Sequence, residues 1–161
     1  MKNNLYRKIF SILMLLLCLP FKAYGEQFDF KVNEIEILNN GNLFKGLNRG
    51  IIETNNGIII EADNFTYNKI TNILNASGEV KINDKINKYK IFSDKITYEK
   101  NEEIIFTNGN SKALDNNQKV IKAENFTYNK NKNILNAKKK VEVEDNINNY
   151  KLISEEITYD K

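Results

Sequence analysis

The sequence has no histidine, and its 161 residues include only one cysteine and one proline. Cys18 and Pro20 both fall in the first 25 residues, so the rest of the chain has none of these three residue types. That part cannot form disulfides, bind metals through thiolate or imidazole groups, or use a cysteine nucleophile or an imidazole base. These absences exclude many familiar catalytic centres, and we expect a protein that is not an enzyme and has no metal or cofactor.

Residues 1–25 have the pattern of a secretory signal peptide. Three basic residues precede the apolar run 9–19, and small residues beside position 24 suit cleavage before Glu26. The run is short for a membrane span of about 20 residues, and no later stretch is comparable. A lipoprotein signal would require a small residue before Cys18, where the chain has Leu17. We therefore expect a secreted mature protein without a lipid anchor.

Charge gives no indication of a nucleic-acid partner. The full chain has 24 basic and 21 acidic residues, but four basic residues lie in the signal segment, which leaves 20 against 21. A nearly neutral mature chain has no excess positive charge to attract nucleic acid or an anionic membrane surface. We expect no nucleic-acid partner, and charge gives no argument for a membrane surface.

A segment of 41 residues occurs twice. Residues 60–100 align without a gap on residues 121–161, and 24 of the 41 positions are identical. Within each copy a Thr-Tyr motif recurs at half the spacing, so the repeat unit is about 30 residues long. One such unit buries too little apolar surface to fold alone, so the repeat predicts a stack in which each unit covers the next.

Alternation of apolar and polar residues, as in residues 80–82, predicts β-strands throughout. We expect no helix after the signal. Residues 26–56 are expected to form opening strands that start or cap the stack, and residues 57–161 to form the repeats. The pairs Asn56-Gly57 and Asn108-Gly109 predict tight turns, because both residue types tolerate positive φ angles.

Each unit should contain a bend. Ile60 and Ala62 have one parity in their strand whereas Phe65 and Tyr67 have the other, so all four share a face only if the strand breaks between them. The same break is expected in the other units, at Asp94-Lys95, Glu124-Asn125 and Glu155-Glu156. The chain would then fold two sheets toward each other in an all-β, jelly-roll-like stack.

The strings Gly57-Ile-Ile-Ile-Glu-Ala-Asp-Asn-Phe-Thr-Tyr-Asn-Lys69 and Asn72-Ile-Leu-Asn-Ala-Ser-Gly-Glu-Val-Lys-Ile82 carry a resemblance. They are similar to the OstA-like domain of the lipopolysaccharide transport and assembly proteins of Gram-negative bacteria. The resemblance covers about Ile51 to Lys161. It implies a twisted, V-shaped β-jelly roll in the periplasm, whose apolar interior shelters the acyl chains of lipid A. Association with the outer membrane is an alternative to a purely periplasmic location.

The matching motif positions and the alignment of the units supply candidate residues for a lipid-binding groove. These are Ala62, Phe65, Tyr67, Leu74, Ala76, Val80, Ile82, Ile105, Ala123, Phe126, Tyr128, Leu135, Ala137, Val141 and Val143. Lys139 stands where the first unit has Gly78, and this departure from the motif predicts looser backbone packing at the second position.

The same family joins its domains edge to edge, which implies further jelly-roll domains as partners. The last strand contains Ile157, Thr158 and Tyr159 and is the candidate for such pairing, with another domain or with a second copy. The family includes a small periplasmic bridge protein and the N-terminal domain of the outer-membrane translocon. The length of the chain suits the bridge, and a fragment of the translocon is the alternative.

The inward-facing apolar residues of the repeats can also be interpreted as a dry, packed core. Every β-stack needs interior apolar residues, so a structural β-solenoid or adhesin module would show the same pattern. Small alanines beside large rings leave room for a ligand, but size alternation also builds packed cores. The pattern alone does not separate the two.

Two rows of charged residues repeat with the unit. The acids Asp63, Asp94, Glu124 and Glu155 are interpreted as solvated structural positions at the bends rather than catalytic groups or calcium ligands. The lysines Lys69, Lys100, Lys130 and Lys161 are interpreted as solvated turn residues, with contacts to lipid phosphates as the alternative.

Overall fold

The computed structural model describes residues 28–116 and 119–160, and the predicted signal peptide lies outside them. The described chain is all-β, as expected, with one 3-10 turn at Asn39–Gly41. The strands are β1 (Phe28–Leu38), β2 (Leu43–Thr54), β3 (Ile58–Ala62), β4 (Asn64–Asn68), β5 (Ile73–Asp84), β6 (Tyr89–Glu99), β7 (Ile104–Asn108), β8 (Ser111–Leu114), β9 (Lys119–Ala123), β10 (Asn125–Asn129), β11 (Ile134–Asp145) and β12 (Tyr150–Asp160). No helix in this part of the chain is long and apolar enough to cross a membrane.

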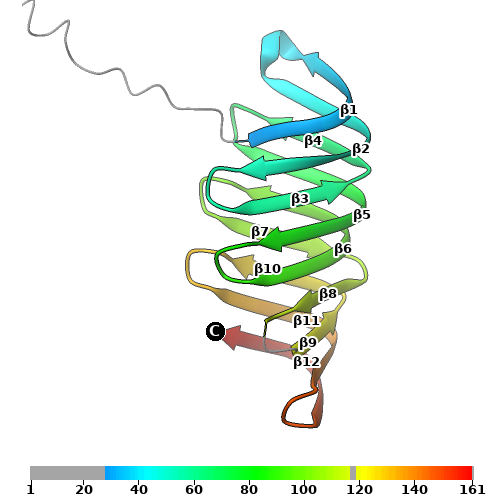
Figure 1. Ribbon diagram of the computed structural model, residues 1–161, viewed down its shortest axis with the longest axis vertical. Helices are drawn as coiled ribbons and strands as arrows, with labels where there is room; N and C mark the ends of the chain where they lie inside the picture. Colours follow the sequence, from blue (N-terminus) through cyan, green and yellow to red (C-terminus); the bar gives the residue numbers. More distant parts are fainter. Residues whose placement is uncertain (1–27, 117–118, 161) are drawn as a thin grey trace, which may run out of the picture.

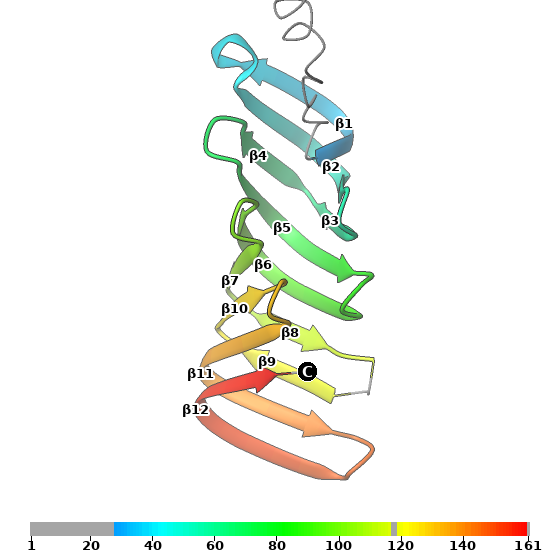
Figure 2. The same ribbon diagram turned by 90° about the vertical axis from the view of Figure 1, so that its left-hand side faces the viewer.

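The strands form an elongated stack with β1 at one end and β12 at the other (Figures 1 and 2). Every pairing is antiparallel, and the long strands take part in two layers. The C-terminal part of β5 pairs with β3 and its N-terminal part with β4. Layer 1 contains β3, β8 and β9, and layer 2 contains β4, β7 and β10, each completed by halves of the long strands.

The layers are joined along one side, which we call the corner, because every long strand bends there. Asp63 separates β3 from β4, and Glu124 separates β9 from β10. The β5–β6 and β11–β12 pairs shift register at the corresponding places. Residues on both sides of a bend face inward, since Ala62 and Phe65 are both buried. The bends expected from the change of parity are confirmed.

Backbone hydrogen bonds hold the corner together. The amide of Asp63 donates to the carbonyl of Gly78 at 3.0 Å. Gly78 has a φ of +81°, and a Cβ atom there would lie 2.4 Å from a carboxylate oxygen of Asp63. Only glycine combines that backbone conformation with such a close neighbour at no steric cost.

The second copy keeps the same backbone contact without the glycine. The amide of Glu124 donates to the carbonyl of Lys139, also at 3.0 Å. Lys139 adopts a φ of +66°, and the longer Glu124 side chain reaches the amine of Lys140 at 2.7 Å. The prediction of looser backbone packing at Lys139 was therefore wrong.

The predicted turns divide into two kinds. Asn56-Gly57 lies in the hairpin turn between β2 and β3, where Gly57 has a φ of +88°. Asn108-Gly109 instead lies at the corner between β7 and β8, where the chain passes from layer 2 to layer 1. The prediction of a tight turn was wrong there, because positive φ angles occur at the bend as well as in the turns.

Candidate functional site

The structure places all 15 candidate groove residues in one buried cluster between the layers. They are Ala62, Phe65, Tyr67, Leu74, Ala76, Val80, Ile82, Ile105, Ala123, Phe126, Tyr128, Leu135, Ala137, Val141 and Val143, and none is more than 8% exposed. The inward parity predicted from the repeat is confirmed. Their role in binding a lipid stays a prediction.

The interior is tightly packed in the middle of the stack. Leu74, Ile105 and Leu135 occupy equivalent positions in successive units, and each is 0% exposed. A side chain with no accessible surface has no water-sized space beside it. Any molecule that enters between the layers must therefore move side chains apart.

One unit carries hydroxyl groups where its neighbours carry apolar side chains. Thr107 and Ser111 occupy the places of Ala76 and Val80, and their oxygens lie 2.6 Å apart. The amide of Phe126 donates to the Thr107 hydroxyl at 2.8 Å. These buried groups are satisfied by one another and by backbone, so they are structural parts of the corner.

Opposite the corner, the hairpin turns of the two layers meet along a side that we call the mouth. Here the phenol of Tyr128 in layer 2 donates to Asp84 in layer 1 at 2.8 Å. The phenol of Tyr159 donates to Asp115 at 2.7 Å. Both pairs are 44 residues apart in sequence. A hydrogen bond to a charged group contributes about 1.5–3 kcal/mol, so these two bonds are a substantial part of what closes the mouth.

These phenols remain donors at neutral pH. Burial, followed by the hydrogen bond to Asp84, raises the pKa of Tyr128 far above its usual range. Burial and the bond to Asp115 raise the pKa of Tyr159 in the same way. Asn87 adds a further bond, because its side-chain amide donates to the Tyr128 oxygen at 2.8 Å and to the Lys130 carbonyl at 2.9 Å.

The mouth is closed differently toward β1, where aromatic rings fill it. The rings of Phe28 and Tyr67 lie 4.7 Å apart in an edge-to-face arrangement, and Phe28 also contacts Tyr98 at 5.9 Å. Phe30 and Phe44 stack beside them at 5.9 Å. Ring contacts of this kind add to the apolar area that they bury.

Two of the four repeated lysines are not solvated. Lys100 and Lys130 are each 8% exposed, whereas Lys69 is exposed and Lys161 lies outside the described residues. Lys100 forms an ion pair with Glu103, which also accepts the phenol proton of Tyr98 at 2.6 Å. The prediction of solvated turn lysines was wrong for these two, because Lys100 pairs with Glu103 of its own turn and Asn87 of layer 1 contacts the carbonyl of Lys130.

The repeated acids lie at the corner and face water. Arg49 pairs with Asp63 at 2.9 Å and with Glu61 at 2.7 Å, both on the outer surface. Across residues 28–116 and 119–160, no group of three or more acidic residues is placed to hold a metal ion. These contacts favour the structural interpretation of the acids.

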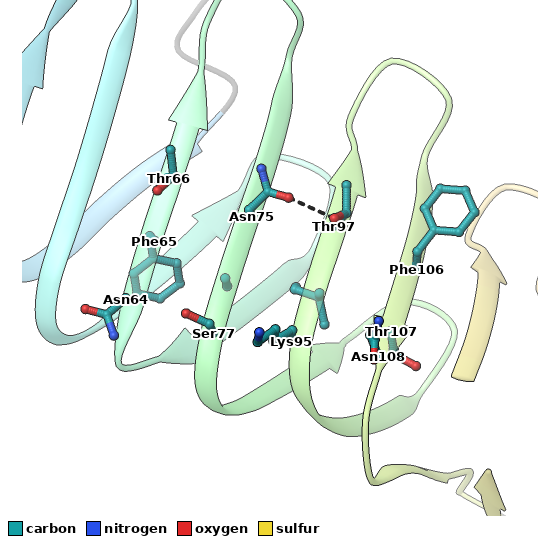
Figure 3. Close-up of a pocket in the computed structure, with 12 residues that line it drawn as sticks. Asn64, Phe65, Thr66, Asn75, Ser77, Lys95, Thr97, Phe106, Thr107 and Asn108 are labelled. Atoms are coloured by element: carbon teal, nitrogen blue, oxygen red, sulfur yellow. Dashed lines mark hydrogen bonds between the residues drawn. The ribbon is translucent and has the colours of Figure 1, made fainter. Parts of the chain in front are cut away.

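A shallow hollow of about 430 Å³ lies on the outer face of layer 2 rather than between the layers (Figure 3). Asn75 and Thr97 lie at its centre on neighbouring strands, and the threonine hydroxyl donates to the asparagine at 2.8 Å. The same bond joins Thr158 to Asn136 in the other copy. The polar part of the lining is therefore a recurring cross-strand contact of the sheet, and the hollow shares only Phe65 and Ala76 with the candidate groove residues.

The two ends of the stack have open strand edges. Within the described chain, β1 pairs only with β2 and β12 only with β11. Ile157 and Tyr159 are half-buried on β12, and Thr158 is exposed. The predicted edge strand is thus available on one side, although its pairing with a partner stays a prediction.

Sequence reasoning missed the bonds that close the mouth. The only available signal was the constant separation of 44 residues between each aspartate and its tyrosine. Such a spacing has no meaning until the two layers are known, because the partners belong to different units.

Comparisons with known proteins support the fold. No model of a known protein family matches the sequence, and no curated protein sequence matches it significantly. A solved structure does match: LptH from Pseudomonas aeruginosa, described as the LptA-homologous periplasmic component of the conserved lipopolysaccharide transport device. The TM-score is 0.63 at 14% sequence identity, over 69% of this chain and 81% of that chain. The likeness confirms the LptA-like β-jelly-roll fold that the sequence motifs predicted.

Proposed function

We propose that the chain is a periplasmic, non-catalytic carrier of lipopolysaccharide that shelters lipid acyl chains between its two layers. The observation that carries the proposal is the fold, which matches that of a lipopolysaccharide transport component over 69% of the chain. The motif resemblance is independent support, because it rests on residues rather than on backbone shape. Residues 1–25 would act as the signal peptide and residues 26–161 as the carrier domain.

The interior has the chemistry that acyl chains require. The buried cluster is apolar along most of the stack, and small residues such as Ala76 and Ala137 lie beside large rings such as Phe65 and Phe126. Each methylene transferred from water into such an interior contributes about 0.8 kcal/mol, so a few chains bind tightly without charged contacts. The sugar and phosphate groups of the lipid would remain in water outside the mouth.

The open strand edges at the ends of the stack would allow the domain to assemble with other domains. An exposed strand with unpaired backbone groups adds a strand from another domain through main-chain hydrogen bonds. Ile157, Thr158 and Tyr159 on β12 would pair with a further jelly-roll domain of the bridge or with a second copy. Such pairing would extend the apolar interior from one domain to the next.

A structural module is the second candidate, and one observation favours it. The interior is packed without water-sized space beside Leu74 or Leu135, as a dry core would be. A carrier must open to load its cargo, whereas a structural module must not.

Site-specific photocrosslinking separates the two functions. A photoreactive phenylalanine analogue replaces Phe126, which is buried and inward, and in a matched control it replaces Phe106, which is 37% exposed on the neighbouring strand β7. Each purified protein is illuminated with lipopolysaccharide. We expect an adduct from position 126 and little or none from position 106.

The outcomes are distinct. Adducts from both positions at similar yield would mean surface adsorption, and no adduct from either position in folded protein would support the structural module. Circular dichroism with a native β-signal for both variants ensures that the comparison concerns folded protein.

A further inference from the structure

We propose that acyl chains enter sideways through the mouth, and that the bonds of Tyr128 with Asp84 and of Tyr159 with Asp115 hold this entrance closed. The inference deepens the proposed function and rests on it. It assigns a gating role to Asp84 and Asp115, which the motif does not single out, and to Tyr128 and Tyr159, which the sequence suggested only as a groove residue and an edge residue.

The corner and the mouth differ in what holds them. At the corner the strands themselves pass from layer to layer, and backbone hydrogen bonds add support, as between Arg49 and Asp63 or between Gly109 and Glu124. At the mouth, the described contacts between layers are made by side chains, chiefly those of Tyr128, Tyr159 and Asn87. The mouth is therefore the side that opens without breaking the sheet.

The aspartates are arranged so that their turns survive opening. Asp84 uses one carboxylate oxygen to accept the amides of Ile86 and Asn87, each at 2.9 Å, and the other to accept the phenol. Asp115 likewise accepts the amide of Lys119 on one oxygen and a phenol on the other. Loss of the phenol leaves the bonds that shape each turn in place.

Asp145 shows that such a turn does not need a phenol. It accepts the amides of Ile147 and Asn148 at 3.0 and 2.9 Å, as Asp84 does in its own turn. No tyrosine of the described residues donates to Asp145, and its turn nevertheless has the same hydrogen bonds. The phenol contacts thus close the mouth rather than build the turns.

Movement of Tyr128 would uncover the predicted groove. In the strand register of layer 2, Tyr128 lies directly between Ile105 and Leu135, and both of these residues are 0% exposed. The aromatic cluster around Phe28 blocks the other half of the mouth with apolar contacts. The opening therefore belongs to the half nearer β12.

A reversible bridge across the mouth tests the inference. Asn87→Cys and Lys130→Cys place two thiols on opposite layers, at residues already joined by a 2.9 Å hydrogen bond. A short, reducible bis-thiosulfonate reagent joins them, and the mature chain has no other cysteine to compete. The matched control carries Asn75→Cys and Thr97→Cys, which bridge two neighbouring strands within layer 2.

We expect the bridge between layers to weaken lipopolysaccharide binding at least tenfold, and reduction to restore it. The bridge within layer 2 should leave binding unchanged. Equal binding by the bridged and reduced forms of the Asn87–Lys130 variant would overturn the inference alone. Absence of binding by the reduced and the unsubstituted protein would overturn the proposed function, and the inference with it.

A second pair of variants loosens the mouth instead. Tyr128→Phe combined with Tyr159→Phe removes both phenols and keeps both rings, and should load lipopolysaccharide at least threefold faster than the unsubstituted protein. Tyr150→Phe is the control, because Tyr150 is 46% exposed on β12 and is not among the candidate groove residues. Unchanged loading by the double variant, or equal acceleration by the control, would count against the gating role.

Discussion

Strands β6 and β12 occupy the same place in the two copies of the repeat, and six of their 11 residues are identical. Their burial is nevertheless different. Tyr89 and Ile91 of β6 are each 1% exposed, whereas the corresponding Tyr150 and Leu152 of β12 are 46% and 43% exposed. The same local sequence thus gives a core strand in one place and a surface strand in the other.

This difference in burial arises because β6 has more neighbouring strands than β12. β6 pairs with β5 on one side and with β7 and β8 on the other. β12 pairs only with β11 within the described chain, so no further unit of the described residues covers its inward face. In a stacked fold the repeat specifies which side chains face inward, and the position in the stack specifies how deeply they are buried.

Replacing the inward-facing residue by alanine in β6 and in β12 should give the largest difference in the free energy of unfolding. Ile91→Ala is expected to lower the free energy of unfolding by about 2–5 kcal/mol, because it leaves a cavity in a packed core. Leu152→Ala should cost less than about 1 kcal/mol, because that side chain already faces water. Urea unfolding at low protein concentration measures both. Equal losses would show that another copy covers β12 in solution.

Removal of a tyrosine hydroxyl at the mouth should change the free energy of unfolding by an intermediate amount. Tyr128→Phe should lower the free energy of unfolding by about 1–3 kcal/mol, because it removes a bond from the fully buried carboxylate of Asp84. Tyr159→Phe should have a smaller effect of about 1 kcal/mol or less, since Tyr159 lies on the exposed edge strand. Thermal unfolding of both variants measures the difference. The reverse order would mean that the β12 end of the mouth is the stronger one.

Substitutions at the corner should give the smallest changes in the free energy of unfolding. Gly78→Ala should cost about 1–2 kcal/mol, because a Cβ atom at positive φ also meets the Asp63 side chain. Lys139→Gly should instead stabilise by up to about 1 kcal/mol, because it relieves the left-handed conformation of a lysine. Chemical denaturation of the two single variants resolves these signs. Stabilisation by Gly78→Ala would contradict the described corner geometry.

Much of the architecture could be predicted because it follows from residue patterns within single strands and from the repeat. The change of parity between Ala62 and Phe65 located the bend, and the alignment of Leu74 with Ile105 and Leu135 located the interior. Both arguments need only the two-residue period of a strand and the repeat itself. The candidate groove residues were found in this way, and all of them are buried.

The errors share one origin. Lys100 and Lys130 look like solvated turn residues in the sequence, but both are buried in the structure. Glu124 and Lys139 keep the backbone contact of an Asp-Gly corner, which becomes visible only when both strands are in place. Each of these features depends on contacts made in the folded chain, which the alternation of residues within one strand does not encode.

The sequence by itself determined the strands, the repeat unit, the bends and the inward face, because these follow from backbone periodicity within about 30 residues. Only the tertiary structure decided which copies of a residue are buried, that the middle of the interior is tightly packed, and that tyrosines of layer 2 meet aspartates of layer 1. The physical reason is that burial and hydrogen bonding between layers depend on which unit lies opposite, and no local pattern encodes the partner across the mouth.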